Sequence, residues 1–584
     1  MPDAILGRMV RHARRPVPPR LGTLAIAAAL LAGACGQATP SQGPAGSESP
    51  AASPSPSTTA ATAPSCSPAS EPADERPWWS ERIFYEVFVR SFADSDGDGV
   101  GDLRGLTARL DSLNDGDPAT DEDLGVSGIW LMPVADAASY HGYDVVDYRT
   151  IEPDYGTADD FRALIAAAHQ RGIAVIVDLV LNHTSRDHPW FEDALTPGSE
   201  HDDWFLWEET RPAVAKSDGS RVWHEANGRF YYGYFWEGMP DLNLENPDVT
   251  AELDDVARFW LEEMGVDGFR LDAARHLIEH GAELENTPET LEWLAGFRDR
   301  LKAEHPDALV LGEVYDSTTM SSRYVREGAL DLTFDFGLAS ATITSLNSRD
   351  AGSIGAAHAD IADDYPLDTV ATFLTNHDQN RVASQLSGDA AAMELAATLL
   401  LTGPGVPFVY YGEEIGMTGR KPDERIRTPM RWDASEPAAG FSTVEPWQPL
   451  GDDPPGVDVA GQAISADSLL AHYRSLTGLR SAHPALLSGA LLPVDSADRH
   501  VVAYLRVAED EAVLVVANLG NQPVEAPALT LAAGPLCGAP AVDVLAGPPD
   551  VAAPAITPDG GFETYVPVPK LAPREAVVAV LGGG

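Results

Sequence analysis

The sequence predicts an α/β protein built on a (β/α)8 TIM barrel, with domain B inserted after the third strand and an antiparallel β-sandwich at the C-terminus. Apolar segments of strand length recur eight times between residues 83 and 411, and helical patterns such as 158–171 and 249–265 lie between several of them. This alternation is typical of a closed parallel barrel. The predicted strands are 83–92, 128–134, 174–182, 266–271, 308–314, 330–336, 370–376 and 406–411.

The first 34 residues have the composition of an export signal. A basic head that includes Arg8, Arg14 and Arg20 precedes the apolar run 21–32, and small residues stand directly before Cys35. Such a pattern is typical of a secretory signal peptide, and the run is too short to span a membrane. Because this cut site resembles a bacterial lipobox, we expect lipidation of Cys35 and an anchor on the extracytoplasmic face of the cell membrane. The alternative is an ordinary signal peptide and full secretion.

Residues 35–77 are rich in Ser, Pro and Ala and have no apolar pattern, so we expect a disordered tether. Export permits a disulfide between Cys66, in this tether, and Cys537, and two free thiols are the alternative. The tether would hold the rest of the protein away from the membrane.

The remaining chain divides into three parts. The barrel is expected over 78–183 and 241–485, with domain B at 184–240 between its third and fourth strands. This insertion contains a cluster of aromatic residues, which form either a platform for a ligand or the core of a small subdomain. Beyond residue 485 the helical pattern stops and strand patterns such as 501–507 and 512–518 follow, so a β-sandwich is expected over 486–584.

The overall charge excludes some classes of partner. The chain has 39 Lys and Arg against 89 Asp and Glu, a formal net charge of −50. Such a protein repels phosphate backbones and anionic lipid surfaces, so nucleic-acid binding is not expected, and the membrane is reached only through the lipid anchor. A neutral or cationic ligand suits the negative electrostatic field of this protein better than an anionic ligand does. The expected oligomeric state is a monomer.

Polar side chains gather where the predicted strands end. Asp178 and His183 end the third strand, and Asp272 ends the fourth. Glu313 ends the fifth strand, and Asp378 follows the seventh. Because functional groups of a barrel lie at the carboxyl ends of its strands, these side chains should meet at one rim.

Carboxyl groups from neighbouring strands suggest chemistry on a glycosidic bond. Such a bond is cleaved by two carboxyl groups, one at the anomeric carbon and one that protonates the leaving oxygen. Arg270 precedes Asp272 by two residues, so both point to the same face of the strand. The cation should keep Asp272 ionised as a nucleophile, while Glu313 should have a raised pKa as the acid. The alternative is a set of ion pairs inside the barrel without a catalytic task.

Four motifs resemble the signature regions of the α-amylase family of glycoside hydrolases, in the same order and with similar spacing. They are 178–183 (DLVLNH), 268–276 (GFRLDAARH), 312–315 (GEVY) and 373–378 (FLTNHD). The segments 128–133 (GIWLMP) and 239–243 (MPDLN) resemble two further family regions. The second is typical of a subgroup intermediate between oligo-1,6-glucosidases and neopullulanases. The resemblance extends from about residue 78 to the end of the chain.

The resemblance implies a role for individual residues. Asp272 would be the nucleophile, Glu313 the general acid/base and Asp378 the stabiliser of the transition state. The family forms a covalent glycosyl-enzyme and retains the α configuration. The substrate-binding residues implied are Tyr143 and Asp144 of the HGYD segment, together with His183, Arg270 and His377.

An acidic loop after the first strand predicts a calcium site. Asp94, Asp96, Asp98, the Val100 carbonyl and Asp102 place oxygen atoms at every second position, as in the first part of an EF-hand loop. Gly105 occupies the place of the bidentate Glu, so the loop is not an EF-hand. It resembles a calcium loop of several α-amylase family members; a solvated acidic turn is the alternative. Asn182 and the His276 carbonyl match ligands of a second family calcium site.

The expected substrate is an α-glucan. We expect an endo-acting α-amylase that hydrolyses α-1,4 bonds in starch, glycogen and maltooligosaccharides. Against this, the calcium loop and 427–433 (RTPMRWD) are similar to those of α-glucosidases and trehalose synthases. The alternatives are therefore an exo-acting α-glucosidase or a transglycosylating, trehalose-forming relative. A non-catalytic glucan-binding lipoprotein is the alternative from another class.

Overall fold

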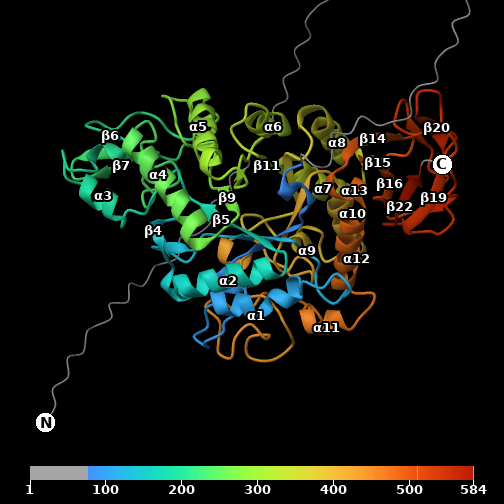
Figure 1. Ribbon diagram of the computed structural model, residues 1–584, viewed down its shortest axis with the longest axis horizontal. Coiled ribbons are helices and arrows are strands. Elements are labelled where there is room, and N and C mark those ends of the chain that lie inside the picture. Colours follow the sequence, from blue (N-terminus) through green and yellow to red (C-terminus); the bar gives the residue numbers. More distant parts are fainter. Residues whose placement is uncertain (1–75, 509–510, 583–584) are drawn as a thin grey trace, which may run out of the picture. The chain divides into compact units, whose positions relative to one another are not determined.

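The computed structural model describes residues 76–508 and 511–582, and its centre is a closed barrel of eight parallel strands. Each strand lies within one of the predicted segments, so the predicted fold class is confirmed (Figure 1). The strands, in chain order, are β1 (Phe84–Val87), β2 (Gly128–Leu131), β5 (Ala174–Leu179), β9 (Gly268–Leu271), β10 (Leu309–Gly312), β11 (Leu332–Phe334), β12 (Val370–Phe373) and β13 (Val406–Tyr410).

The barrel strands are nearly continuous apolar runs because both of their faces are buried. One face packs into the barrel interior, where Phe84 stacks on Phe408 with ring centroids 4.6 Å apart and Trp130 lies against Phe334. The other face contributes to a large core shared with the surrounding helices. The interior is therefore a packed core, which leaves only the rims for a site.

Helices surround the barrel (Figure 1). The predicted segment 158–171 forms α2, whose N-terminus carries a capping box between Thr157 and Asp160. The segment predicted as one helix over 249–265 is an α-helix followed by a π-helical turn at Trp260–Met264, which ends at Gly265 in a left-handed conformation. The longer helices are α1 (Leu103–Leu113), α2 (Ala158–Gln170), α4 (Pro247–Phe259), α5 (Pro288–Glu304), α6 (Thr318–Arg326), α7 (Phe336–Ser348), α8 (Gly352–Asp364), α10 (Ala390–Thr402) and α12 (Leu469–Ala482).

Between β5 and β9 the chain forms a small inserted subdomain. It contains α3 (Pro189–Ala194) and a three-stranded sheet of β6 (Trp207–Glu208), β8 (Arg229–Tyr232) and β7 (Trp223–Ala226). Phe191, Trp207 and Tyr231 pack together, and Tyr231 is fully buried. These aromatic residues form a subdomain core, which is one of the two interpretations that the sequence left open. Phe235 and Trp236 differ, because they are 39% and 50% exposed.

The C-terminal region is antiparallel, as predicted. Seven strands form one sheet in the order β19-β22-β16-β15-β14-β18-β20, and β17 (Val524–Glu525) pairs with β21 (Lys570–Leu571). The two sheets share one hydrophobic cluster, as expected of a sandwich. The strands of the larger sheet are β14 (Ala490–Ser496), β15 (Val501–Ala508), β16 (Glu511–Asn518), β18 (Leu529–Leu531), β19 (Ala541–Ala546), β20 (Phe562–Tyr565) and β22 (Ala576–Gly582).

The predicted leader and most of the tether, with Cys35 and Cys66, lie outside the described residues. The lipidation and the disulfide with Cys537 therefore stay predictions. Within residues 76–508 and 511–582, no helix combines the length and the apolar composition needed to cross a bilayer.

Candidate active site

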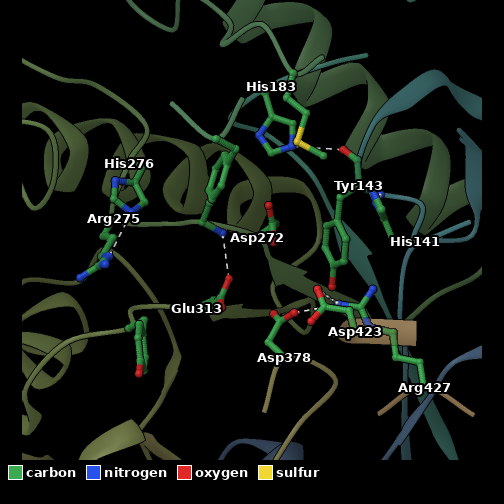
Figure 2. Close-up of a pocket in the computed structure, with 14 residues that line it drawn as sticks. His141, Tyr143, His183, Asp272, Arg275, His276, Glu313, Asp378, Asp423 and Arg427 are labelled. Atoms are coloured by element: carbon green, nitrogen blue, oxygen red, sulfur yellow. Dashed lines mark hydrogen bonds and ion pairs between the residues drawn. The ribbon is translucent and has the colours of Figure 1, made fainter. Parts of the chain in front are cut away.

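A cavity of about 300 Å³ opens at the rim of the barrel where the predicted catalytic residues meet (Figure 2). Asp272 follows β9, Glu313 follows β10 and Asp378 follows β12, so all three come from the carboxyl ends of strands. The cavity is lined by His141, Tyr143, His183, Phe235, Met239, Asp272, Ala273, Arg275, His276, Glu313, Tyr315, Asp378, Asp423 and Arg427.

Arg270 lies beneath this cavity and holds three carboxylates. Its guanidinium nitrogens lie 2.7 Å from Asp178 Oδ1, 2.8 Å from Asp272 Oδ1 and 2.7 Å from Glu313 Oε2. The Arg270 side chain is only 1% exposed. A buried cation of this kind requires paired anions, and its planar fork fixes their positions as well as their charge. The arginine therefore orients the two carboxyl groups that the sequence indicated for catalysis.

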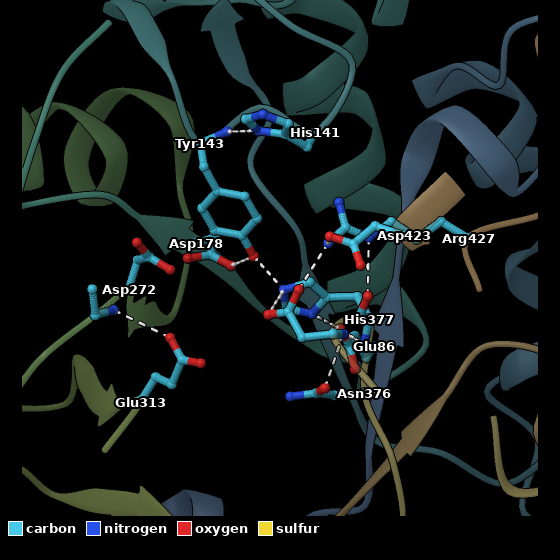
Figure 3. A network of polar contacts seen from close by, with 12 residues as sticks. Glu86, His141, Tyr143, Asp178, Asp272, Glu313, Asn376, His377, Asp423 and Arg427 are labelled. Atoms are coloured by element: carbon cyan, nitrogen blue, oxygen red, sulfur yellow. Dashed lines mark hydrogen bonds and ion pairs between the residues drawn. The ribbon is translucent and has the colours of Figure 1, made fainter. Parts of the chain in front are cut away.

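A hydrogen bond from the backbone also fixes Glu313. The backbone N–H of Ala273 donates a hydrogen bond to Glu313 Oε2 at 3.2 Å (Figure 3). Ala273 directly follows Asp272 and has a φ of 50°, a left-handed conformation that is unusual for a residue with a side chain. Strain of this kind is typical of functional sites. The turn at Ala273 therefore links the backbone next to Asp272 to the carboxylate of Glu313.

Burial dominates the ionisation of both carboxyl groups. Burial raises the pKa of Glu313, although Arg270 opposes the shift, and the nearby charges of Asp272 and Asp378 add to it. This direction suits a general acid. Burial also raises the pKa of Asp272, and Arg270 offsets this only in part, whereas the sequence led us to expect that Arg270 would dominate. The reason is that Asp272 is buried at the rim of the barrel, and its local sequence does not show this burial.

Asp378 belongs to a chain of alternating charges with His377 and Glu86, and Figure 3 shows the last two of these residues. Its Oδ2 lies 3.1 Å from His377 Nε2, and His377 Nδ1 lies 2.5 Å from Glu86 Oε1. Burial disfavours the imidazolium, but Asp378 and Glu86 outweigh it and raise the pKa of His377 to about 10. Burial likewise opposes ionisation of Asp378, but His377 and Arg427, 2.8 Å away, lower the pKa of Asp378 well below its usual range. Asp378 is thus a fixed anion beside a fixed cation.

Tyr143 and His183 form the wall opposite the carboxyl groups. The Tyr143 hydroxyl donates to Asp178 Oδ2 at 3.0 Å and lies 2.7 Å from His377 Nε2. The Tyr143 ring is nearly parallel to that of His377, with centroids 5.6 Å apart. Burial lowers the pKa of His183 to about 4, so this histidine is neutral. Because His183 Nε2 faces the Tyr143 carbonyl at 3.1 Å, and a carbonyl only accepts, Nε2 carries the proton.

Three of the predicted substrate-binding residues, Asp144, Arg270 and His377, do not line the catalytic cavity. Asp144 Oδ1 accepts hydrogen bonds from the backbone N–H and the hydroxyl of Ser139, at 3.1 and 2.9 Å, and so holds the loop that presents Tyr143. A direct contact of Asp144 with the sugar stays a prediction.

Several residues of the site were not predicted from the sequence. Glu86 is a charged residue inside an otherwise apolar barrel strand, and a buried charge of this kind needs a partner. That signal could have identified it. Asp423 and Arg427 reach the site from the long segment after β13. Arg427 contacts both Asp378 and Asp423, and nothing in the local sequence indicates these contacts.

The acidic loop brings part of the predicted calcium ligands together. Asp94, Asp96 and Asp102 each place a carboxylate oxygen within 4.8 Å of the others. The loop is preorganised, since Asp94 accepts hydrogen bonds from the backbone N–H groups of Gly97 and Gly99 at 2.7 and 2.9 Å. Asp98 is not one of this cluster, and its Oδ1 accepts from its neighbour Val100 at 2.8 Å. The clustered carboxylates are hard oxygen ligands of the type that calcium prefers.

A second group of buried oxygen atoms includes the predicted ligand Asn182. The Asn182 side chain interacts with the Asp241 carboxyl group, and the Glu279 carboxyl group interacts with Asp241 and with Tyr232. Burial raises the pKa of Asp241 to about 8 and that of Glu279 well above its usual range, and the Asp241 charge adds to the shift of Glu279. Clustered buried carboxyl oxygens fit a bound cation. Asp241 and Glu279 were not among the ligands predicted from the sequence.

The fold and the site define a class of enzyme. A closed (β/α)8 barrel whose strand ends carry two carboxyl groups on a shared arginine, with a third carboxylate beside them, is the arrangement of a glycoside hydrolase.

The comparison with protein families identifies that class more closely. The model of the α-amylase catalytic domain matches residues 86–489, and the chain belongs to the α-amylase family of glycoside hydrolases and transglycosylases. "Alpha-amylase 3" of Dictyoglomus thermophilum is 40% identical over 459 residues, which cover 76% of this chain and 86% of that protein. The trehalose synthase/amylase of Mycobacterium tuberculosis is 34% identical over 521 residues, which cover 78% and 84%. The crystal structure of the α-amylase from H. orenii is 38% identical, with a TM-score of 0.71 over 86% of this chain and 99% of that one.

Proposed function

We propose that the protein is an α-amylase that hydrolyses α-1,4-glucosidic bonds in starch, glycogen and maltooligosaccharides with retention of configuration. The observation that supports this proposal most is the pair Asp272 and Glu313, both held by Arg270 at the mouth of an open cavity. The 40% identity to a relative that is named an α-amylase supports the substrate class.

The first step forms a covalent intermediate. The carboxylate of Asp272 attacks the anomeric carbon, and the bond from that carbon to the leaving oxygen breaks. The Glu313 carboxyl gives its proton to that oxygen, so the shortened glucan leaves as an alcohol. Burial raises the pKa of Glu313, which is the direction that suits a proton donor.

The second step releases the sugar. Glu313, now a carboxylate, takes a proton from water, and the oxygen of that water attacks the anomeric carbon and displaces Asp272. The anionic Asp378, which lines the cavity, faces the sugar throughout as positive charge develops on the ring, and the buried cation His377 beside it holds Asp378 in place. Tyr143 supplies the flat wall against the same ring.

Calcium is part of the proposal. Asp94, Asp96 and Asp102 would hold one ion beside β1 and thereby fix the loop that precedes α1. Asn182, Asp241 and Glu279 would hold a second where the inserted subdomain meets the barrel. In both places the ion would supply charge neutralisation for clustered oxygens, and so stability, with no part in the bond cleavage.

The leader and the tether complete the proposal. The enzyme would be exported as a monomer and held outside the cell membrane by a lipid on Cys35. A Cys35→Ala variant tests the anchor: it should move from the membrane fraction to the medium, whereas full secretion of the unaltered protein would contradict the anchor.

A product time course tests the activity. The protein without residues 1–77 should shorten starch rapidly and release mixed maltooligosaccharides, and its Asp272→Asn variant should do neither. Glucose from maltose with little shortening of starch would indicate an α-glucosidase. Binding of glucans without turnover would overturn the catalytic proposal in favour of a glucan-binding lipoprotein.

The second candidate is a transglycosylase that forms trehalose or longer products. It is favoured by the 34% identity to a protein named trehalose synthase/amylase. Trehalose formed from maltose in the same time course would establish it.

A further inference from the structure

The apolar interior of the barrel adjoins two buried cations. Trp130 on β2 belongs to the hydrophobic cluster inside the barrel, together with rings such as Phe84 and Phe408. The side chains of Arg270 and His377, next to this cluster, are only 1% and 0% exposed. Carboxylates pair with both cations, but hydrocarbon stabilises a charge poorly. The side of the cations that faces the core therefore requires a favourable contact of another kind.

Trp130 makes a contact of this kind with both cations. The guanidinium carbon of Arg270 lies 5.2 Å from the centre of the Trp130 ring. The His377 ring is inclined by 74° to the same indole, with the ring centroids 5.6 Å apart. The π face of an indole is electron-rich and attracts a cation within about 6 Å, more strongly where water is excluded. Trp130 is also the register partner of Glu86 on the neighbouring strand, and Glu86 contacts His377 as well.

A second aromatic residue, Tyr143, contacts the same two cations. The guanidinium carbon of Arg270 lies 5.8 Å from the centre of the Tyr143 ring. The hydroxyl of Tyr143 reaches toward His377 (Figure 3), and the two rings are inclined by only 16°. Tyr143 lines the catalytic cavity, whereas Trp130 belongs to the core of the barrel. The two cations therefore have one aromatic neighbour that faces the substrate and another that belongs to the core.

Packing alone does not explain a tryptophan at position 130. Its Nε1 atom is buried, and among the residues that the structure describes it has no hydrogen-bond partner. A buried N–H group without an acceptor is unfavourable, and a phenylalanine or a leucine would fill the barrel interior without that cost. An indole is, however, the aromatic ring that attracts cations most strongly. The cost of the unused N–H is therefore consistent with a role of the π face toward Arg270 and His377.

We propose that Trp130 is a positioning residue whose indole fixes the cations Arg270 and His377 from the side of the barrel core. Through these cations it keeps the three carboxyl groups at the rim in the geometry that the reaction needs. Trp130 does not line the cavity, so it acts on the substrate only through its neighbours. The contacts exist without substrate, and only the kinetic part of the test rests on the proposed function.

The direct test measures the pKa of His377 without any substrate. The full chain with 13C-labelled histidine is titrated by NMR, and the His377 signal is identified as the one that is missing in His377→Gln. Trp130→Leu should lower this pKa by about one unit, as expected when a cation loses a buried aromatic partner. Trp130→Phe should lower it less, and it tests the inference if Trp130→Leu does not fold. Glu86, Asp378 and Tyr143, which contact His377, are unchanged in both variants. An unchanged pKa in the folded variants would overturn the inference.

Kinetics on maltoheptaose test the effect on the reaction. Trp130→Leu should lower kcat about 10- to 100-fold with little change in KM, because the reacting groups are held less well, and Trp130→Phe should recover most of kcat. Phe84→Leu is the matched control, since Phe84 is buried in the same cluster and stacks on Phe408. It should keep both kcat and the pKa of His377. An equal loss in Phe84→Leu would show that Trp130 only fills space and would overturn the inference. A wild type that cleaves no glucan would overturn the proposed function alone, because the titration still decides the role of Trp130.

Discussion

The charge chain from Glu86 to Asp378 makes a prediction about pH. In the wild type, Glu86 Oε1 lies 2.5 Å from His377 Nδ1. The substitution Glu86→Gln keeps an oxygen that can accept a hydrogen bond from His377 Nδ1, but it removes the negative charge. The two side chains are 2% and 0% exposed, so solvent screens their interaction little. Two unit charges about 4 Å apart interact by roughly 4 kcal/mol at an effective dielectric constant of about 20. A pKa shift of one unit corresponds to about 1.4 kcal/mol. Loss of the Glu86 charge should therefore lower the pKa of His377 by about 3 units.

The sign of the effect follows from the charged form of His377. The pKa of His377 is raised to about 10, against the effect of burial, by Asp378 and Glu86, so the wild type keeps the imidazolium across the neutral range. Without the Glu86 charge, the His377 imidazolium loses its proton at a lower pH. The variant should therefore resemble the wild type in acid and lose activity as the pH rises through neutrality.

The assay is the pH dependence of kcat/KM on maltoheptaose, expressed as the ratio of variant to wild type. The ratio cancels ionisations that both proteins share, such as that of Glu313. We expect it to be constant near pH 5 and to fall about 100-fold by pH 9. Glu511→Gln is the matched control, because Glu511 accepts from His483 Nδ1 at 2.7 Å far from the site, and its ratio should stay constant. A folded Glu86→Gln enzyme whose ratio does not change with pH would refute the reasoning.

Three further predictions concern Arg270, the acidic loop and Arg506. Arg270→Lys keeps the charge but loses the fork that holds Asp272 and Glu313, so kcat should fall about 100- to 1,000-fold with little change in Tm, and a kcat near wild type would contradict this. After EDTA treatment, calcium at 100 times its dissociation constant should stabilise the protein by about 2.7 kcal/mol per site, and Asp96→Asn should reduce the gain in Tm; equal gains in both proteins would argue against the loop site. Arg506 is fully buried and donates to the carbonyls of Thr402 and Gly489, so Arg506→Met should lower the free energy of unfolding by about 2–5 kcal/mol in denaturant titrations. An unchanged titration midpoint would show that these carbonyls find other partners.

The barrel strands could be predicted because their signal is local. A strand that is buried on both faces needs an unbroken apolar run, and every observed barrel strand lies within such a run. The position of a carboxylate directly after a run is equally local, so the sequence alone predicts Asp272, Glu313 and Asp378 at the rim. The inserted subdomain followed from the distance between two strands.

Other features depend on contacts between distant parts of the chain. Glu86 and His377 are 291 positions apart, and Arg427 reaches Asp378 from a segment without regular structure. Their neighbours in sequence do not reveal such pairs. Only closure of the barrel, in which β13 alone separates β1 from β12, brings Glu86 close to His377. The burial that raises the pKa of Asp272 has the same origin.

The sequence by itself determined the fold class, the family resemblance and the three carboxyl groups at the rim, since these depend on periodicity and on motifs of a few residues. Only the tertiary structure decided that Asp144 holds the loop of Tyr143, and that Asp241 interacts with Asn182 and Glu279. It also distinguished the buried Tyr231 from the exposed Trp236, two aromatic residues five positions apart. The physical reason is that burial and charge pairing are properties of the whole packed chain, and they determine which side chains can meet a substrate.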